Sequence, residues 1–346
     1  MEIAEGLFTP DVMFFDSASY GLLPARATDA MRQQIDLFSR GQVDIKDFDS
    51  VVTSALGSVA NAYGCPSDHF GAIGQLATVS SMVAHSIPNG AKVLMAQEDF
   101  TSVLFPFLER ETKGEISINF VPAEKIVETI DDTYTLIAVS AVQSSTGYVI
   151  DLNGLSERAR SSGIKTFLDA TQGAGWLPID LDDFDVVAAS AYKWLLSPRG
   201  SGFVHTTSKA QEWLRPTMSS WYAGDEIWSS IYGPPLRLAN DGRRYQISPD
   251  WLSWVGAEQS LKIISELGVG NAYRHNLGLM EHFCELIRTP FNDSSITCID
   301  TNITTEDLRA NGFRASLRNG RLRISIHIYN TADEVEKLAA LLNSTN

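Results

Sequence analysis

Short apolar runs, each followed by a turn of polar or glycine residues, recur along the first two thirds of the chain. A continuous apolar run of this length is typical of a strand that is buried on both faces, as in parallel sheets. The runs that predict such strands are residues 92–95, 136–140, 167–168 and 186–190, with a further strand at 203–205 after a glycine-rich turn.

Helical and alternating patterns complete the prediction. A helix is expected at about residues 26–40, and another begins within residues 74–86. The last part of the chain combines helical patterns with an alternating strand at 321–327. We therefore predict an α/β protein with an N-terminal arm (1–15), a large domain (16–250) and a smaller α+β C-terminal domain (251–346).

The composition of the chain argues against several classes of function. The chain has 346 residues, 44% of them apolar, so it can bury a large core. Its net charge of −15 argues against a nucleic-acid partner, which normally requires a basic patch. We see neither a signal peptide nor a membrane span. The three cysteines have no metal-ligand spacing, so we predict no metal site and expect a cytoplasmic protein.

Asp169 and Lys193 are the residues with the most distinctive chemistry. Asp169 follows the run at 167–168, and Lys193 follows the run at 186–190 between Tyr192 and Trp194. Carboxyl ends of parallel strands are where open α/β sheets bind ligands. Pyridoxal phosphate (PLP) requires an amine for a Schiff base and a carboxylate beside its pyridine nitrogen. Taken singly, the aspartate is more often a cap or turn residue and the lysine a surface group.

Residues 74–86, GQLATVSSMVAHS, place hydroxyl groups at the beginning of a predicted helix. A helix N-terminus offers unpaired N–H groups and the positive end of the helix dipole, which suits a phosphate. Ordinary N-capping explains the same residues equally well from sequence alone.

The DATQ motif at 169–172 and the SAYK motif at 190–193 together resemble the class V aminotransferase family of PLP enzymes. The resemblance covers most of the chain and implies PLP fold type I, with a mostly parallel seven-stranded sheet in the large domain. It also implies that Asp169 bonds the pyridine nitrogen, that Gln172 contacts the ring hydroxyl, that Lys193 attaches the cofactor and that Ser190 binds its phosphate.

Other positions take family roles by the same resemblance. Thr78 and the backbone of Val79 are expected to hold the phosphate. Phe100 stands where relatives commonly carry a histidine that stacks on the ring, so it can stack but cannot transfer protons. Ser144 stands where many relatives have an asparagine that bonds the ring hydroxyl. Ser248 would reach the phosphate of a neighbouring subunit, which implies a homodimer with shared sites.

The resemblance also implies a substrate end. RISIHIYNT at 323–331 matches the family signature in which the first arginine grips the substrate carboxylate, here Arg323. Arg318 either contacts a second acidic group or braces its loop. Tyr20 and Gly21 lie in a segment that crosses the mouth of the site in the family, although a simple turn and helix entry explains them too.

The absence of a suitably placed cysteine argues against a cysteine desulfurase reaction. Cysteine desulfurases need a nucleophilic cysteine shortly before the carboxylate-binding arginine, and residues 304–321 contain none. Cys298 lies in a β-branched run, residues 296–299, in which a cysteine is usually inert packing.

The segment WYAG at 221–224 resembles the corresponding segment of enzymes that act on S-conjugated cysteines. Its aromatic residues, such as Trp221, could line a substrate pocket, but packing in the core explains them equally well. We therefore expect a PLP-dependent C–S β-lyase acting on a small amino-acid substrate, with a role in sulfur-containing natural product biosynthesis. Decarboxylating oxidative deamination of the same conjugates is the runner-up. An aminotransferase, an epimerase and a non-catalytic binding subunit remain open.

Overall fold

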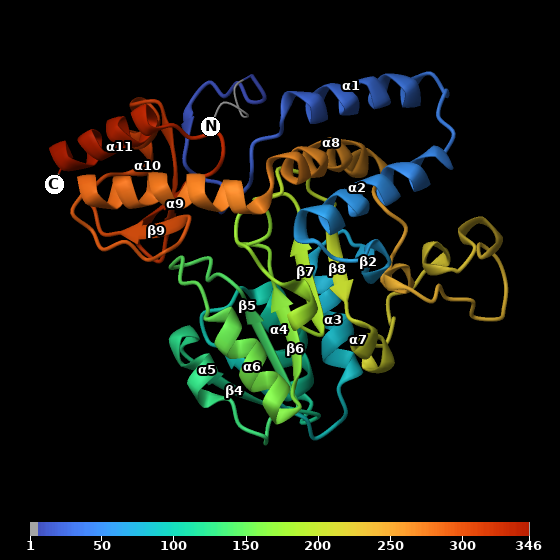
Figure 1. Ribbon diagram of the computed structural model, residues 1–346. Helices are drawn as coiled ribbons and strands as arrows, with labels where there is room; N and C mark the ends of the chain where they lie inside the picture. The colour runs from blue at the N-terminus through green and yellow to red at the C-terminus, as the bar shows by residue number, and fades with distance from the viewer. Residues whose placement is uncertain (1–5, 346) are drawn as a thin grey trace.

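The computed structural model describes residues 6–345 and shows a large central sheet flanked by helices (Figure 1). The sheet contains, in spatial order, β2 (Phe70–Ala72), β8 (Gly202–Thr206), β7 (Val186–Ser190), β6 (Lys165–Asp169), β5 (Leu136–Ser140), β3 (Lys92–Ala96) and β4 (Ser117–Val121). The strands from β7 to β4 are parallel, whereas β8 is antiparallel to both of its neighbours. This architecture confirms the predicted mostly parallel sheet of seven strands.

Side chains alternate between two apolar cores, one on each face of the sheet. One core contains α3 (Leu76–Ser86), α4 (Thr101–Thr112) and α7 (Ser208–Trp213). The other contains α2 (Asp47–Tyr63), α5 (Ile126–Thr129), α6 (Leu152–Ser162) and α8 (Trp251–Leu267). In β3, Val93 and Met95 join the first core while Leu94 and Ala96 join the second. Burial on both faces explains why these strands appear as continuous apolar runs.

A smaller sheet forms near the C-terminus, with the order β11 (Ser316–Arg318), β12 (Arg321–Ser325), β9 (Ile296–Ile299). Packed with it are α9 (Val269–Leu286), α10 (Thr305–Ala310) and α11 (Ala332–Thr345). The predicted alternating strand at 321–327 is present as β12, but it ends at Ser325. Leu322 and Ile324 join the apolar core on one face. The N-terminal segment covers the opposite face, where Ser325 accepts a hydrogen bond from the amide of Ala18.

The N-terminal segment belongs structurally beside this small sheet. β1 (Met13–Phe14) pairs in parallel with β10 (Phe313–Arg314), and Phe15 lies in the same apolar core as α9 and α11. Helix α8 packs instead on α1 (Ala25–Ser39) and α2, as Figure 1 shows at the top. Residues 1–5 of the expected arm lie outside the described residues, and the domain division near residue 250 stays a prediction.

Short 3-10 turns connect the main elements, at Ser67–His69, Ala123–Lys125, Leu181–Asp183, Trp221–Ala223, Ile227–Ser229 and Gly242–Tyr245. Among the described residues, no helix has the length and apolar character needed to cross a membrane.

Candidate active site

A cleft opens at the carboxyl ends of β5, β6 and β7, where Ser140, Asp169 and Ser190 terminate neighbouring strands. Two adjoining hollows form it and share Phe100, Ser144, Gln172, Tyr192 and Lys193. The inner hollow continues to the N-terminus of α3, and the outer hollow continues to Ser19, Arg318 and Arg323. Most of the predicted site residues therefore converge on one cleft.

Asp169 is fixed at the end of β6 and is 4% exposed. One of its carboxylate oxygens accepts a hydrogen bond from the amide of Thr171 (2.8 Å), and the other accepts one from the Ser140 hydroxyl (3.3 Å). Burial raises the pKa of Asp169, while these hydrogen bonds and the charge of Lys193 oppose the rise. A cationic group beside this carboxylate would keep it ionised.

Lys193 follows β7 by three residues, and its side chain is buried in the same cleft. Its ammonium lies 5.6 Å from the centre of the Phe100 ring and 5.7 Å from that of Tyr192. Burial lowers the pKa of Lys193 to about 8, and the positive charges of Arg323, Arg318 and Arg199 act in the same direction. A substantial fraction of the amine is therefore neutral near pH 8, as a nucleophile or base requires.

The inner hollow reaches the N-terminus of α3, where the phosphate is predicted to bind. Gln75, Leu76 and Ala77 line the cleft, and the Leu76 amide donates a hydrogen bond to the Ser190 hydroxyl (3.2 Å). Thr78 instead donates its hydroxyl to the Gln75 carbonyl, and the Val79 side chain is fully buried. Thr78 is also part of the first helical turn, so the predicted phosphate contacts of Thr78 and of the Val79 backbone stay predictions.

The outer hollow, where the substrate is predicted to bind, is assembled around Arg323, which is 3% exposed on β12. Its guanidinium donates to the Ser144 carbonyl (2.8 Å) and to the hydroxyls of Ser19 (2.7 Å) and Ser316 (3.2 Å). It also lies 3.6 Å from Asp16, which partly offsets its charge. Arg318 is exposed and donates to the same Ser19 hydroxyl (3.0 Å). Ser144 therefore orients Arg323 through its backbone.

Gln172 lies in the cleft, but its amide is occupied by protein partners. Its nitrogen donates to the Ala18 carbonyl (3.0 Å), and its oxygen accepts from the Trp194 indole (2.8 Å). Gly21 donates its amide to Tyr192, and a Cβ built on it would come within 2.0 Å of the Lys193 carbonyl. Only glycine permits this close approach of the N-terminal segment to the lysine loop.

Besides Gly21, Thr78 and Val79, three more predicted residues do not line the cleft within one chain. Tyr20 is 42% exposed and packs edge-on against Phe14. Ser248 is exposed and donates its amide to Ser220. Trp221 contacts the Tyr222 and Trp228 rings beside a separate surface hollow. The roles predicted for Ser248 and Trp221 stay predictions.

Sequence reasoning missed two charged residues of the cleft. Arg199 stacks over the Tyr192 ring at 4.9 Å and reaches the same hollow as the α3 terminus. Asp99 accepts hydrogen bonds from the Gln143 amide group (2.6 Å) and the Ser140 backbone (3.2 Å), and burial raises the pKa of Asp99 to about 7. The available signals were that Asp99 directly precedes Phe100 and that Arg199 lies in the glycine-rich turn six residues after Lys193.

Comparison with known proteins agrees with this geometry. The Aminotransferase class-V family model matches residues 13–305. The chain belongs to this family. An uncharacterized aminotransferase of Bacillus subtilis is 27% identical over 53% of the chain and 46% of that protein. Isopenicillin N epimerase of Streptomyces clavuligerus is 29% identical over 60% of each chain. The chain thus matches about half to three fifths of the length of these relatives.

The fold has close counterparts among solved structures. A cystine C–S lyase in complex with cysteine persulfide superimposes with a TM-score of 0.87, at 16% identity, over 97% of this chain and 98% of that one. At this identity the likeness concerns the fold alone.

The cofactor of this family is pyridoxal phosphate, and the cleft fits it. Asp169 offers a carboxylate for the pyridine nitrogen, Lys193 an amine for the aldehyde, and Phe100 a ring for stacking. The amides at Leu76 and Ala77, with Arg199, form a cationic end for the phosphate. When bound, PLP supplies a ring that accepts electrons from the substrate.

Proposed function

We propose that this protein is a C–S β-lyase that cleaves S-substituted cysteine conjugates to a thiol, pyruvate and ammonia. The observation that carries the proposal is the pairing of Lys193 and Arg323 in one cleft whose described lining residues include no cysteine. The lysine is placed to move a proton and the arginine to hold a carboxylate. A desulfurase mechanism, in which the substrate sulfur is transferred to a protein cysteine, would require a thiol there.

The residues divide the work as follows. Arg323, held by Ser19 and Ser144, binds the substrate α-carboxylate and fixes its orientation. The neutral amine of Lys193 takes the α-proton, because Phe100 offers no titratable group. The β-carbon–sulfur bond then breaks with its electron pair on sulfur, and a proton makes the free thiol. The remaining 2-aminoacrylate takes up one water and gives pyruvate and ammonia.

Cys298 does not supply the missing thiol. It is the cross-strand neighbour of Arg323, but its side chain is 6% exposed and its thiol donates to the Ser145 carbonyl (3.1 Å). Burial raises the pKa of Cys298, which disfavours a reactive thiolate.

The deciding experiment is mass spectrometry of products after incubation of the PLP-loaded protein with a panel of S-substituted cysteines. Equal amounts of thiol, pyruvate and ammonia are expected, absent in Lys193→Ala and retained in the exposed control Lys125→Ala. Carbon dioxide with an S-linked aldehyde would replace the proposal by decarboxylating deamination. A keto acid that keeps the sulfur group would indicate transamination.

We also propose that the active form is a cytoplasmic homodimer in a natural-product pathway. Ser248 is exposed in the single chain, and Phe105 on α4 is 62% exposed in an apolar groove beside the cleft. Light scattering should give twice the chain mass. Ser248→Ala should weaken PLP binding, whereas Ser344→Ala, on the exposed end of α11, should not. A monomer with full activity would reject the dimer.

A further inference from the structure

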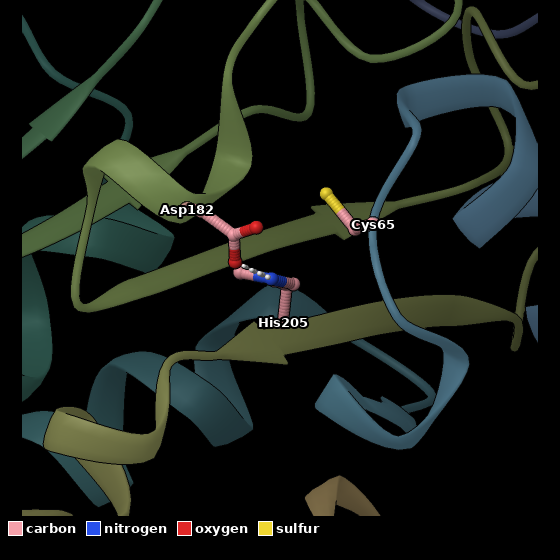
Figure 2. Close-up of side chains that lie close together, drawn as sticks. All are labelled: Cys65, Asp182 and His205. Atoms are coloured by element: carbon pink, nitrogen blue, oxygen red, sulfur yellow. Dashed lines mark ion pairs between the residues drawn. The ribbon is translucent and has the colours of Figure 1, made fainter.

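A second cluster of reactive side chains lies away from the cleft. Cys65 follows α2, Asp182 lies in the turn between β6 and β7, and His205 is on β8. Figure 2 shows the three side chains directed toward one another from these separate segments. Their sulfur, oxygen and nitrogen atoms all lie within 4.8 Å of one another.

His205 is the unusual member of this cluster. Its side chain is completely buried, and neither ring nitrogen has a hydrogen-bond partner among the described residues. Its Nε2 lies 3.2 Å from Asp182, but the alignment that a hydrogen bond needs is not met. Buried polar atoms in native proteins almost always have a partner, so this imidazole points to a missing ligand.

We propose that Cys65, Asp182 and His205 bind one zinc ion. Thiolate, imidazole and carboxylate are the three ligand types that zinc takes in proteins. The thiolate and carboxylate together neutralise the charge of the ion, and His205 contributes a neutral nitrogen. Water fills the fourth position on the solvent side, where the Asp182 side chain is 47% exposed.

The geometry needs little adjustment. Tetrahedral zinc holds its ligand atoms about 3.3–3.8 Å apart, so movements on the order of 1 Å bring the three atoms into place. His69 lies against the carboxylate, with its Nδ1 3.3 Å from the same Asp182 oxygen. A protonated Nδ1 would hold Asp182 in position, as outer partners of metal ligands commonly do.

Zinc binding should displace the proton of the Cys65 thiol. Burial, reinforced by the charges of Asp182 and Asp180, raises the pKa of Cys65 to about 11, so the thiol is protonated in the metal-free chain. Formation of the zinc–sulfur bond therefore releases one proton to solvent, with no change of oxidation state. The ligands pin the α2 exit and the β6–β7 turn to β8.

The site is separate from the cleft. His205 pairs with Val187 in the sheet, whereas Ser190, at the cleft, pairs with Gly202. Three residues along a strand correspond to about 10 Å. The ion would therefore stabilise the large domain and take no part in catalysis.

The test uses the full-length, PLP-loaded protein, stripped with EDTA and then equilibrated with zinc chloride. Elemental analysis after gel filtration should find about one zinc per chain, and zinc should raise Tm by about 3 °C or more. In the cobalt-substituted protein, an intense sulfur-to-cobalt absorption band should report the Cys65 ligand.

Cys65→Ala and Asp182→Asn should each lose the zinc and the rise in Tm, and Cys65→Ala should also lose the band. Cys284→Ala and His282→Ala are the matched controls and should keep all three signals. Because Asp182 is half exposed, Asp182→Asn should fold even if Cys65→Ala does not. Zinc content equal in Asp182→Asn and the wild type, or no zinc and no rise in Tm in the wild type, would overturn the proposal.

Discussion

The two ends of the cleft are built in different ways. Asp169, Ser190 and Lys193 come from neighbouring strands of one sheet and the loop that follows, and all three are buried. The substrate end combines Ser19, Ser144 and Arg323 from segments far apart in the sequence, and Arg318 at its rim is exposed. The cofactor end is therefore part of the rigid core, whereas the substrate end depends on how three segments meet.

This difference assigns separate tasks to the two ends. Hydrogen bonds within the sheet hold Asp169 in one orientation whatever the substrate. Arg323 is positioned by Ser19, Ser144, Ser316 and Asp16, so small changes there should alter which substrates fit. Variants at the cofactor end should abolish chemistry, whereas variants at the substrate end should mainly change KM and selectivity.

Lys193→Ala is expected to have the largest effect. Among the described residues that line the inner hollow, Lys193 is the only one with an amine, so its loss should lower kcat by about 10³-fold or more. Steady-state kinetics at saturating substrate would measure the loss, and the visible band of lysine-bound PLP should disappear. Retention of more than a tenth of wild-type kcat would reject the assignment of Lys193.

Arg323→Gln tests the substrate end. Charge-assisted hydrogen bonds to a carboxylate contribute about 2–3 kcal/mol, so kcat/KM should fall about 100-fold, mostly through KM. The exposed Arg318→Gln is the matched comparison and should cost less than about 10-fold. Equal effects would show that both arginines bind the substrate directly.

The cofactor end of the cleft could be predicted from the sequence, whereas the contacts of the substrate end could not. β5, β6 and β7 were predictable because burial on both faces leaves apolar runs, and strand ends place Asp169 and Ser190 in the cleft. The contact of Ser19 with Arg323 links residues 304 positions apart, and no local pattern encodes it.

The first turn of α3 shows a second limit of what the sequence can reveal. Backbone amides bear the expected anion site, and they leave no mark in side-chain chemistry. Hydroxyls at Thr78 and Ser80 were the visible signal, yet Ser80 donates to the Val103 carbonyl inside the core.

Asp99→Asn should change the pH dependence of stability. Burial raises the pKa of Asp99 to about 7, so its protonated form is favoured in the folded state. Its contribution to stability is present below the unfolded pKa near 4 and is lost as the pH rises through about 7. Between pH 5 and pH 8, the Tm of the wild type should therefore fall by about 3 °C more than the Tm of the variant.

Scanning calorimetry at the two pH values measures this difference, and the exposed Asp68→Asn serves as the control. Parallel Tm curves for wild type and Asp99→Asn would contradict the raised pKa.

The pH dependence of PLP uptake gives the smallest expected effect. Only the neutral Lys193 amine attacks the aldehyde, so the uptake rate of the cofactor-free protein should rise with pH and level off above about 8. Arg199 is one of the charges that lower this pKa, so Arg199→Gln should move the midpoint upward by less than one unit. Stopped-flow absorbance measures the midpoint, and the exposed Arg309→Gln should leave it unchanged. Because Arg199 also borders the predicted phosphate site, its loss should slow PLP uptake at every pH. The midpoint of the pH curve reports only the pKa of Lys193, so it separates this slower uptake from the change in pKa.

A wild-type midpoint near 10.5 would show that burial does not activate the lysine.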